Sequence, residues 1–324
     1  MDCTRNEKAG ALGKMGACFF TETLTTRIII NYAGCNEKNR TLFSLKGVRI
    51  DMKELHQQVV VLDRLREEGM RLPFQFAEEQ DRPEGIAIGR LLKDPALLRE
   101  LMHNVAKQMK SDNLVAAASL FQKRLASVLL ASVLTPLSTV GLGLIADADT
   151  TEIVLVDNLP SSVILGGKQQ MLLVNRMPHD VQNMGGHVHE DLAAVQHVLK
   201  AVFDNTLGPL IYLIASEFKL SPKVMWGNVG NFVGYLYGEL CEHPVYKQGA
   251  AADKELVFNS VGFTAPPLSE TFQEVWFEEI SPARKIRVRN SCCLWNQFPG
   301  NKSCTTCPLV CSAERAELLT AYNA

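Results

Sequence analysis

A dense group of cysteines near the carboxyl end places the strongest constraint on how this chain can fold. Five of its nine cysteines lie in the last tenth of the 324 residues, at Cys292, Cys293, Cys304, Cys307 and Cys311. The first four are spaced Cys-Cys-x10-Cys-x2-Cys, with a Pro299-Gly300 turn between the two pairs. This segment can therefore bring four thiols to one point, where thiolates bind zinc, copper(I) or an iron–sulfur cluster.

The spacing of the cysteines helps to separate these metal centres. Structural zinc sites usually combine two chelating pairs, each with a short spacer, and Cys304-Thr-Thr-Cys307 has that form. The neighbours Cys292 and Cys293 would close on one ion only with strain, because successive side chains diverge. The irons of a two-iron cluster can each take one of these neighbours, or the pair can straddle the cluster. We expect Cys292, Cys293, Cys304 and Cys307 to be the ligands, with Cys311 as a spare, and zinc as the alternative.

Composition indicates a globular protein that does not bind nucleic acid. The chain is 47% apolar and 21% charged, with a formal net charge of −2 and no block of like charge. Residues 1–20 carry several charges and lack the apolar core of an export signal, so we expect a cytoplasmic location. In that compartment an odd number of cysteines indicates reduced thiols or metal ligands.

One uncharged run, residues 125–146, is long enough to cross a bilayer. Its serines, threonines and glycines dilute the apolar character. We therefore expect a buried helix that ends near Leu134, followed by a turn at Pro136. Peripheral membrane association is the alternative.

The remaining pattern predicts a helix-rich α+β fold with a small antiparallel sheet. Asp94-Pro95 is a typical helix start, and Gly166-Gly167 suggests a hairpin. The domains expected are residues 1–112, of uncertain role, and 113–324, which contain the cysteine segment 290–311. Helices are expected at 51–68, 94–110, 114–134, 189–217 and 222–241. Strands are expected at 25–32, 152–157, 162–165, 171–175 and 286–289, and a loop at 71–85.

Several residues could assist the cysteine site. In an extended segment Lys285, Arg287 and Arg289 share one face. They could attract an acidic partner, or simply form a solvated edge strand. Arg289 lies three residues before Cys292 and is the best placed to tune the charge at the cysteines. Trp226 and Asn228 are expected to be core and helix-surface residues, respectively.

The cysteine segment resembles the C-terminal signature of the FhuF-like ferric-siderophore reductases. The similarity runs from Cys292-Cys293-Leu294 through Phe298-Pro299-Gly300 to Cys304-Thr-Thr-Cys307-Pro308-Leu309. In that family the Cys-Cys-x10-Cys-x2-Cys motif holds a [2Fe–2S] cluster. A weaker similarity extends over roughly the last two-thirds of the chain. It includes residues 120–142, 152–175 and Trp226-x-Asn228.

This resemblance implies an oxidoreductase that passes one electron from a [2Fe–2S] cluster to an Fe(III)–siderophore and releases Fe(II) for iron assimilation. The partners implied are a ferric siderophore and an external electron donor such as a ferredoxin or flavodoxin, since no nucleotide-binding motif stands in its proper context. The cysteines would carry electrons, so no separate catalytic residue is expected. The alternatives are a siderophore-binding or redox-sensing iron–sulfur protein without turnover, and a zinc-stabilised protein.

Overall fold

A computed structural model describes residues 43–45, 48–50, 60–63, 65–67, 69–77, 81–166, 171–174, 188–277 and 284–323. Residues 40–324 form one compact unit. Helices predominate in it and are accompanied by small sheets, which confirms the predicted α+β class. The strand expected at 25–32 lies outside the described residues, and the domain boundary expected after residue 112 stays a prediction.

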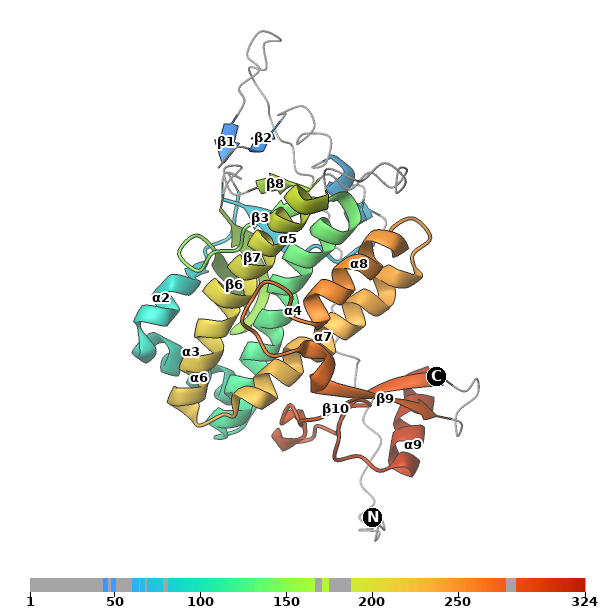
Figure 1. Ribbon diagram of the computed structural model, residues 1–324. Helices are drawn as coiled ribbons and strands as arrows, with labels where there is room; N and C mark the ends of the chain where they lie inside the picture. The colour runs from blue at the N-terminus through green and yellow to red at the C-terminus, as the bar shows by residue number, and fades with distance from the viewer. Residues whose placement is uncertain are drawn as a thin grey trace. The chain divides into compact units, whose positions relative to one another are not determined.

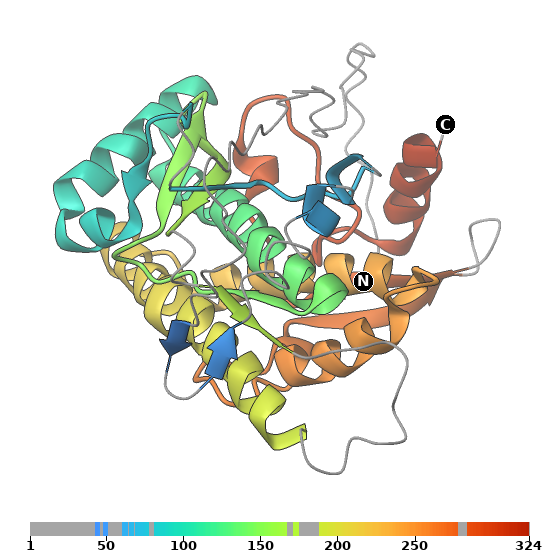
Figure 2. The ribbon, with the colours of Figure 1, turned by 90° about the horizontal axis from the view of Figure 1, so that it is seen from above.

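Helix α4, Leu114–Val140, is the structural centre of this unit. Nearly every residue from Ala116 to Ser138 is buried, because the helix is apolar or small-residued on all sides. Other helices surround it (Figure 1 and Figure 2). They are α3 (Pro95–Gln108), α5 (Val188–Val202), α6 (Gly208–Phe218), α7 (Pro222–Glu242) and α8 (Lys247–Phe258).

Side-chain caps begin two of these helices. The Asp94 carboxylate accepts a hydrogen bond from the Leu97 N–H at 3.0 Å, which confirms the helix start predicted there. At α4 the Asn113 side chain accepts from the Ala116 N–H at 3.0 Å. The polar residues before residue 114 therefore end α3 and start α4, as the sequence predicted.

The prediction that α4 ends near Leu134 is wrong, because the helix continues through Pro136 to Val140. Proline removes a helix hydrogen bond and usually kinks or ends a helix. Here residues 135–138 are all buried, and their packing outweighs that loss. The helix ends instead at Gly141, whose φ of 66° is left-handed and whose N–H donates to the Pro136 carbonyl.

Two helical runs in the described part of the chain, α4 and residues 192–218, could cross a membrane by length and composition alone. In α4, 72% of the most apolar window is buried within the protein. A buried core helix meets the same criteria, so the finding is weak evidence for a membrane span. The second run is interrupted by a π-helical turn at Phe203–Leu207, within the helix predicted at 189–217.

The main sheet has the strand order β3-β7-β6-β4, with β3 parallel to β7 and the other pairs antiparallel. Its strands are β3 (Phe74–Phe76), β4 (Ile86–Ala87), β6 (Glu152–Val156) and β7 (Leu159–Leu165). β3 falls within the loop predicted at 71–85. Two shorter antiparallel pairs are β1 (Phe43–Leu45) with β2 (Val48–Ile50), and β5 (Leu142–Leu144) with β8 (Met171–Leu173). Helix α2 spans Ile88–Lys93.

The hairpin predicted at Gly166-Gly167 is wrong. The tight turn lies between β6 and β7, where Asp157 and Asn158 have φ values of 51° and 59°. Aspartate and asparagine tolerate this left-handed conformation, which the tight hairpin turn requires. β8 pairs with β5 instead of β7.

The last part of the chain forms a separate small layer that carries the cysteines. Strands β9 (Phe272–Phe277) and β10 (Arg284–Arg289) pair antiparallel and contact α7 (Figure 1). Helix α9, Ser312–Asn323, covers them through a small apolar cluster of Phe277, Ile286 and Leu319. Short 3₁₀ turns lie at Leu268–Thr271 and Trp295–Gln297. The cysteine segment connects β10 to α9.

Candidate metal centre

The cysteine segment begins where β10 ends, and backbone hydrogen bonds fold it back onto that end. Arg289, the last residue of β10, donates its N–H to the Thr306 carbonyl at 2.9 Å. The Cys307 N–H donates to the Cys304 carbonyl at 2.9 Å, which closes the Cys-x2-Cys turn. Cys292 and Cys293 follow Arg289 in the chain, so both cysteine pairs reach the same end of the strand.

The structure brings the four predicted ligand thiols into one group. Cys292 Sγ lies 3.7 Å from Cys307 Sγ. Arg289 Nη2 lies 3.0 Å from Cys293 Sγ and 2.7 Å from Cys304 Sγ. Cys293 and Cys307 are buried, whereas Cys292 and Cys304 are partly exposed. Their role as ligands stays a prediction. Ligands of one cluster must lie close together, and these four thiols do.

Arg289 is the most unusual side chain of the site, because its guanidinium is buried with only 1% of the residue exposed. Burial alone would lower the pKa of Arg289, but the charges of Cys293 and Cys304 and the hydrogen bonds to both raise it. Among the described residues its Nε–H has no acceptor. The two thiols are therefore among the partners that hold this cation in the interior.

Asn228 fixes the other side of the guanidinium. Its Oδ1 accepts a hydrogen bond from Arg289 Nη1 at 3.1 Å, and its Nδ2 donates to Gln122 Oε1 at 3.0 Å. Asn228 is 2% exposed, so the prediction of a helix-surface residue is wrong. The reason is that α7 is covered on this side by α4 and by the end of β10. Ser119 of α4 also donates its hydroxyl to the Cys293 carbonyl at 2.9 Å.

Arg315, on α9, secures the second cysteine pair from outside. Its guanidinium donates to the carbonyls of Cys307 at 2.7 Å and Val310 at 3.0 Å, and also to the Thr305 carbonyl. It is 4% exposed. Sequence reasoning missed this residue, because bonds to backbone carbonyls leave no signature in the side-chain pattern. The signal that could have found it is a cation four residues after the last cysteine.

The first cysteine pair is held close to α7 by a glycine. A Cβ built on Gly227 would lie 2.4 Å from Ser291 Oγ, which is nearer than any side chain can approach. Ser291 precedes Cys292 and donates its hydroxyl to the Lys223 carbonyl at 3.2 Å. Glycine at position 227 therefore lets the cysteine segment lie directly on the helix.

Two aromatic residues lie within the cysteine loop. Phe298 is 2% exposed and belongs to the main hydrophobic core, and Trp295 packs edge-to-face on it at 6.0 Å between ring centroids. Leu294, with a φ of 62°, donates its N–H to Cys292 Sγ at 3.4 Å. Packing in the core and this hydrogen bond together fix the conformation of the cysteine loop.

The predicted cationic face of β10 is divided in the structure. Arg289 turns inward to the thiols. Arg287 is half-buried, and its guanidinium lies against Gly234 of α7. Only Lys285 is exposed, and it pairs with Glu274 of β9 at 3.4 Å. The predicted row of three surface cations is therefore wrong. Cys311 lies just before α9, where its carbonyl accepts the Arg315 N–H at 3.0 Å.

The donor set fits a two-iron cluster. Among the described residues no three His, Cys, Asp or Glu side chains are arranged as ligands of one metal ion. A hydrogen bond with Cys304, together with burial, raises the pKa of Cys293 to about 12, and a hydrogen bond with Cys304 lowers the pKa of Cys307. Thiolates at the buried Cys293 and Cys307 need compensating charge, and Arg289 supplies one positive charge in contact with Cys293 and Cys304.

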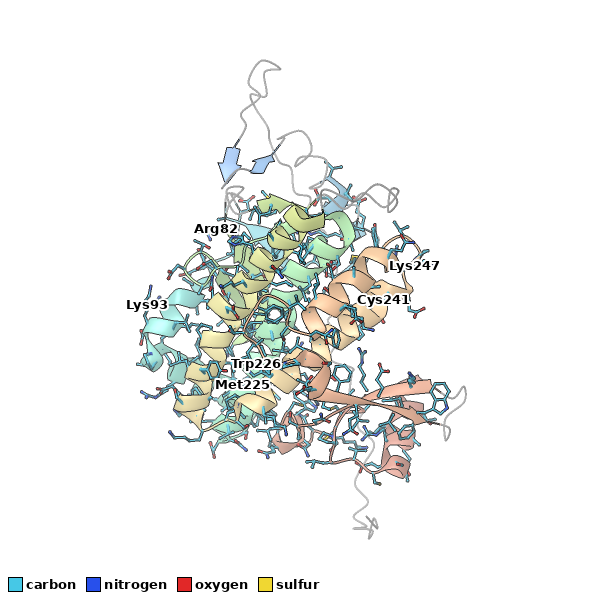
Figure 3. The ribbon with its side chains drawn as sticks, viewed as in Figure 1. Arg82, Lys93, Met225, Trp226, Cys241 and Lys247 are labelled. Atoms are coloured by element: carbon cyan, nitrogen blue, oxygen red, sulfur yellow. The ribbon has the colours of Figure 1, made fainter. Side chains whose placement is uncertain are left out.

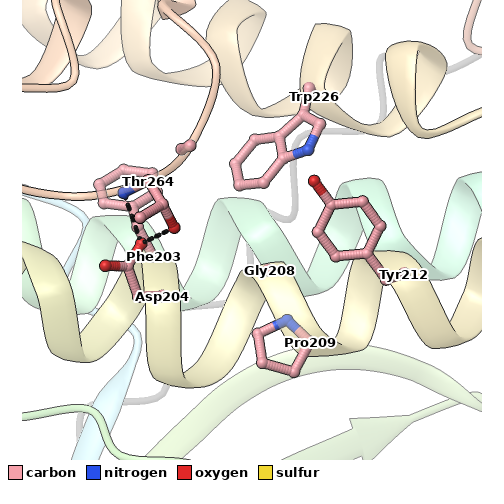
Figure 4. A pocket seen from close by; sticks show the side chains of 8 residues that line it. Phe203, Asp204, Gly208, Pro209, Tyr212, Trp226 and Thr264 are labelled. Atoms are coloured by element: carbon pink, nitrogen blue, oxygen red, sulfur yellow. Dashed lines mark hydrogen bonds between the residues drawn. The ribbon is translucent and has the colours of Figure 1, made fainter.

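A cavity of about 170 Å³ lies between the π-helical turn, α6 and the start of α7. Trp226, near the start of α7 (Figure 3), and Tyr212 border one end, and Asp204 and Thr264 border the other (Figure 4). A dry cavity of about 150 Å³ holds a molecule the size of benzene. This cavity therefore has room for one aromatic ring or a short chain.

Two family models match this chain. The model described as "Ferric iron reductase FhuF-like transporter" matches residues 119–273, and the one described as "FhuF 2Fe-2S C-terminal domain" matches residues 289–309. Together they cover just over half of the chain and include Arg289, Asn228 and all four predicted ligands. No curated protein matches the chain significantly.

Solved structures that match part of this chain include aerobactin synthetases of a hypervirulent pathotype of Klebsiella pneumoniae. The ATP-bound synthetase IucA has a TM-score of 0.48 and 14% identity over 64% of this chain and 44% of its own. A second IucA structure has a TM-score of 0.47 and 13% identity over 70% and 46%. The synthetase IucC has a TM-score of 0.40 and 16% identity over 52% and 31%. The chain spans less than half the length of each.

Proposed function

This chain belongs to the FhuF-like ferric iron reductase family and carries that family's [2Fe–2S] C-terminal domain, and on this premise we propose that it reduces ferric siderophores by one electron. The observation that carries the proposal is the group of four thiols, two of which contact the buried Arg289 guanidinium. This group lies within the segment that the [2Fe–2S] model matches. The products are Fe(II), for iron assimilation, and the iron-free siderophore.

The chemistry of the iron explains why one electron is enough. Siderophores hold Fe(III) through hard oxygen donors, and Fe(II), with a lower charge and a larger radius, is held far less tightly by the same atoms. A bound [2Fe–2S] cluster supplies a one-electron couple, whose potential depends on net charge, hydrogen bonds to sulfur and solvent exposure. Reduction therefore releases the metal and leaves the carrier intact.

The protein residues assign the thiols two different environments. Cys293 and Cys307 are buried, which protects the site from water, whereas Cys292 and Cys304 are partly exposed and give an electron a short way to the surface. The exposed surface close to them carries Lys302, Lys223 and Leu309, the last with 70% of its surface exposed. Positive and apolar side chains together suit an anionic partner.

We propose that the electron comes from an acidic ferredoxin or flavodoxin that docks on this surface. The described part of the chain shows no nucleotide fingerprint in a strand–helix context. The reaction is assigned to the cytoplasm because reduced thiols and iron–sulfur ligands belong in a reducing compartment. Peripheral membrane association stays the alternative.

The proposal is tested by mixing anaerobically reduced protein with ferric siderophores of the hydroxamate and catecholate types in a stopped-flow instrument. Reoxidation of the protein should accompany formation of one Fe(II)–ferrozine complex per electron. The Cys311→Ser variant serves as the matched control, because it changes a cysteine of the same segment outside the predicted ligand set, and should react like the parent. Cys293→Ser should lose the reaction.

The alternatives give different results in the same experiment. A siderophore-binding or redox-sensing protein would bind the ferric siderophore tightly without reoxidation or Fe(II) release. A zinc-stabilised protein would be colourless and would contain stoichiometric zinc. Either result would remove the reductase proposal.

A further inference from the structure

We infer that the four thiolates form two ligand pairs, Cys292 with Cys307 and Cys293 with Cys304, and that Arg289 contacts only the second pair. The cysteine spacing leaves this pairing open, and the distances between the side chains decide it. The inference rests on the proposed cluster and its four ligands. It is independent of whether a siderophore is the substrate.

The first pair is defined by the distance between its sulfur atoms. Two thiolates on one tetrahedral metal with bonds of about 2.3 Å lie about 3.8 Å apart. Cys292 Sγ and Cys307 Sγ are 3.7 Å apart. These two sulfurs already have the separation that a single iron requires.

The second pair is defined by a shared donor. Arg289 Nη2 lies 3.0 Å from Cys293 Sγ and 2.7 Å from Cys304 Sγ. One nitrogen in contact with both sulfurs keeps them on the same side of the group. The guanidinium therefore lies at this pair.

The competing arrangement places Cys304 and Cys307 on one iron, as in a zinc knuckle. The Cys307 N–H donates to the Cys304 carbonyl at 2.9 Å, so these two residues also lie close together, and their closeness alone does not decide the pairing. That arrangement requires Cys292 and Cys293 to share the other iron. Their sulfurs turn to different partners, Cys292 to Cys307 and Cys293 to Arg289. Neighbouring side chains diverge along an extended backbone, which accounts for this separation.

The pairing makes the site electrostatically unequal. Each pair has one buried and one partly exposed thiol, so burial is similar for both. The charge at the sulfurs is different, because the buried Arg289 contacts the thiols of Cys293 and Cys304, whereas the buried Arg315 contacts Cys307 at its backbone carbonyl. The interaction between charges is strong at contact distance in a poorly hydrated interior. The negative charge that reduction adds is therefore best stabilised at the Cys293–Cys304 side.

Single serine variants of the four cysteines test the pairing. A serine changes mainly the iron that it binds, so variants of one pair should share a spectrum. We expect the electron paramagnetic resonance g values and midpoint potentials of Cys293→Ser and Cys304→Ser to agree with each other. Those of Cys292→Ser and Cys307→Ser should agree with each other and differ from the first set. Agreement between Cys304→Ser and Cys307→Ser, or four unrelated spectra, would overturn the inference.

A second measurement keeps all four cysteines and applies if serine variants lose the cluster. In ⁵⁷Fe-labelled protein, Arg289→Gln should change the Mössbauer doublet of one iron and leave the other in place. Arg289→Lys, which keeps the charge, should restore most of the parent spectrum. Two doublets that change equally, or neither, would contradict the inference. These spectra need no siderophore, so failure of the reductase assay would leave the test intact.

Discussion

Asn228 Oδ1 accepts a hydrogen bond from Arg289 Nη1 at 3.1 Å, although the two residues are 61 positions apart in the chain. This bond joins the interior of α7 to the guanidinium that contacts Cys293 and Cys304. Because Asn228 in turn donates to Gln122 of α4, the two longest described helices support the same cation. The charge next to the thiols is thus held by the core of the fold.

Replacement of Arg289 should make the site harder to reduce. Arg289→Gln removes a buried positive charge beside two sulfurs, and the reduced state is the more negative one. The midpoint potential should fall by at least about 60 mV, a tenfold change in the one-electron equilibrium. Redox titration followed by absorbance measures this shift. Arg287→Gln is the matched control, because it removes a half-buried arginine from the same strand, and a shift as large there would contradict the assignment.

Gly227→Ala should displace the neighbouring cysteines Cys292 and Cys293. The added methyl would meet Ser291 Oγ, and the overpacking should cost about 1–3 kcal/mol of unfolding free energy and speed cluster loss. Gly238→Ala on the same helix is the control, since its Cβ would meet only the Arg287 side chain at 3.6 Å. That change should be neutral or stabilising by about 0.5–1 kcal/mol. Thermal unfolding of the cluster-loaded protein compares the two.

Arg315→Leu should loosen the turn that carries Cys304 and Cys307. The substitution leaves the carbonyls of Cys307 and Val310 without this donor, at about 1–3 kcal/mol for each group that stays unpaired. Loss of visible absorbance after addition of an iron chelator should be at least tenfold faster than in the parent. Glu317→Gln, an exposed change on the same helix, should leave the rate unaltered, and equal rates in both variants would refute the role of Arg315.

Lys302→Glu should slow reduction by an acidic electron donor. This lysine is exposed two residues before Cys304, so reversal of its charge should lower the association rate several-fold at low salt. The difference should shrink at high ionic strength, where exposed charges are screened. Stopped-flow rates with reduced flavodoxin at two salt concentrations provide the measurement. Lys200→Glu, the same charge change on α5, should have no such effect; an equal loss there would show a non-specific charge effect.

Local signals in the sequence predicted most helices and the place of the site. Asp94-Pro95 marked a helix start because its cap lies within one turn, and the cysteine spacing marked a loop that can close on itself. The helix end predicted near Pro136 was wrong, because the burial of residues 135–138 in the core outweighs the hydrogen bond that the proline removes. The hairpin predicted at Gly166-Gly167 was wrong, because the tight turn lies at Asp157 and Asn158, two residue types that also adopt the left-handed conformation.

The support of the thiols could not be predicted from sequence in the same way. Asn228 and Arg315 act through partners that only the folded chain brings near. Asn228 had the pattern of an ordinary helical residue, and Arg315 binds backbone carbonyls. Arg289 was found because it lies close to Cys292 in the chain, although its burial was not foreseen.

The most direct test is an anaerobic titration of the dithionite-reduced protein with one ferric hydroxamate siderophore, followed by electron paramagnetic resonance. Iron, sulfide and zinc are assayed on the same sample. We predict two irons and two sulfides per chain, by analogy with two-iron clusters, and a reduced signal that disappears in step with Fe(II) formation. Stoichiometric zinc without a signal, or a signal that persists in excess siderophore, would contradict this prediction.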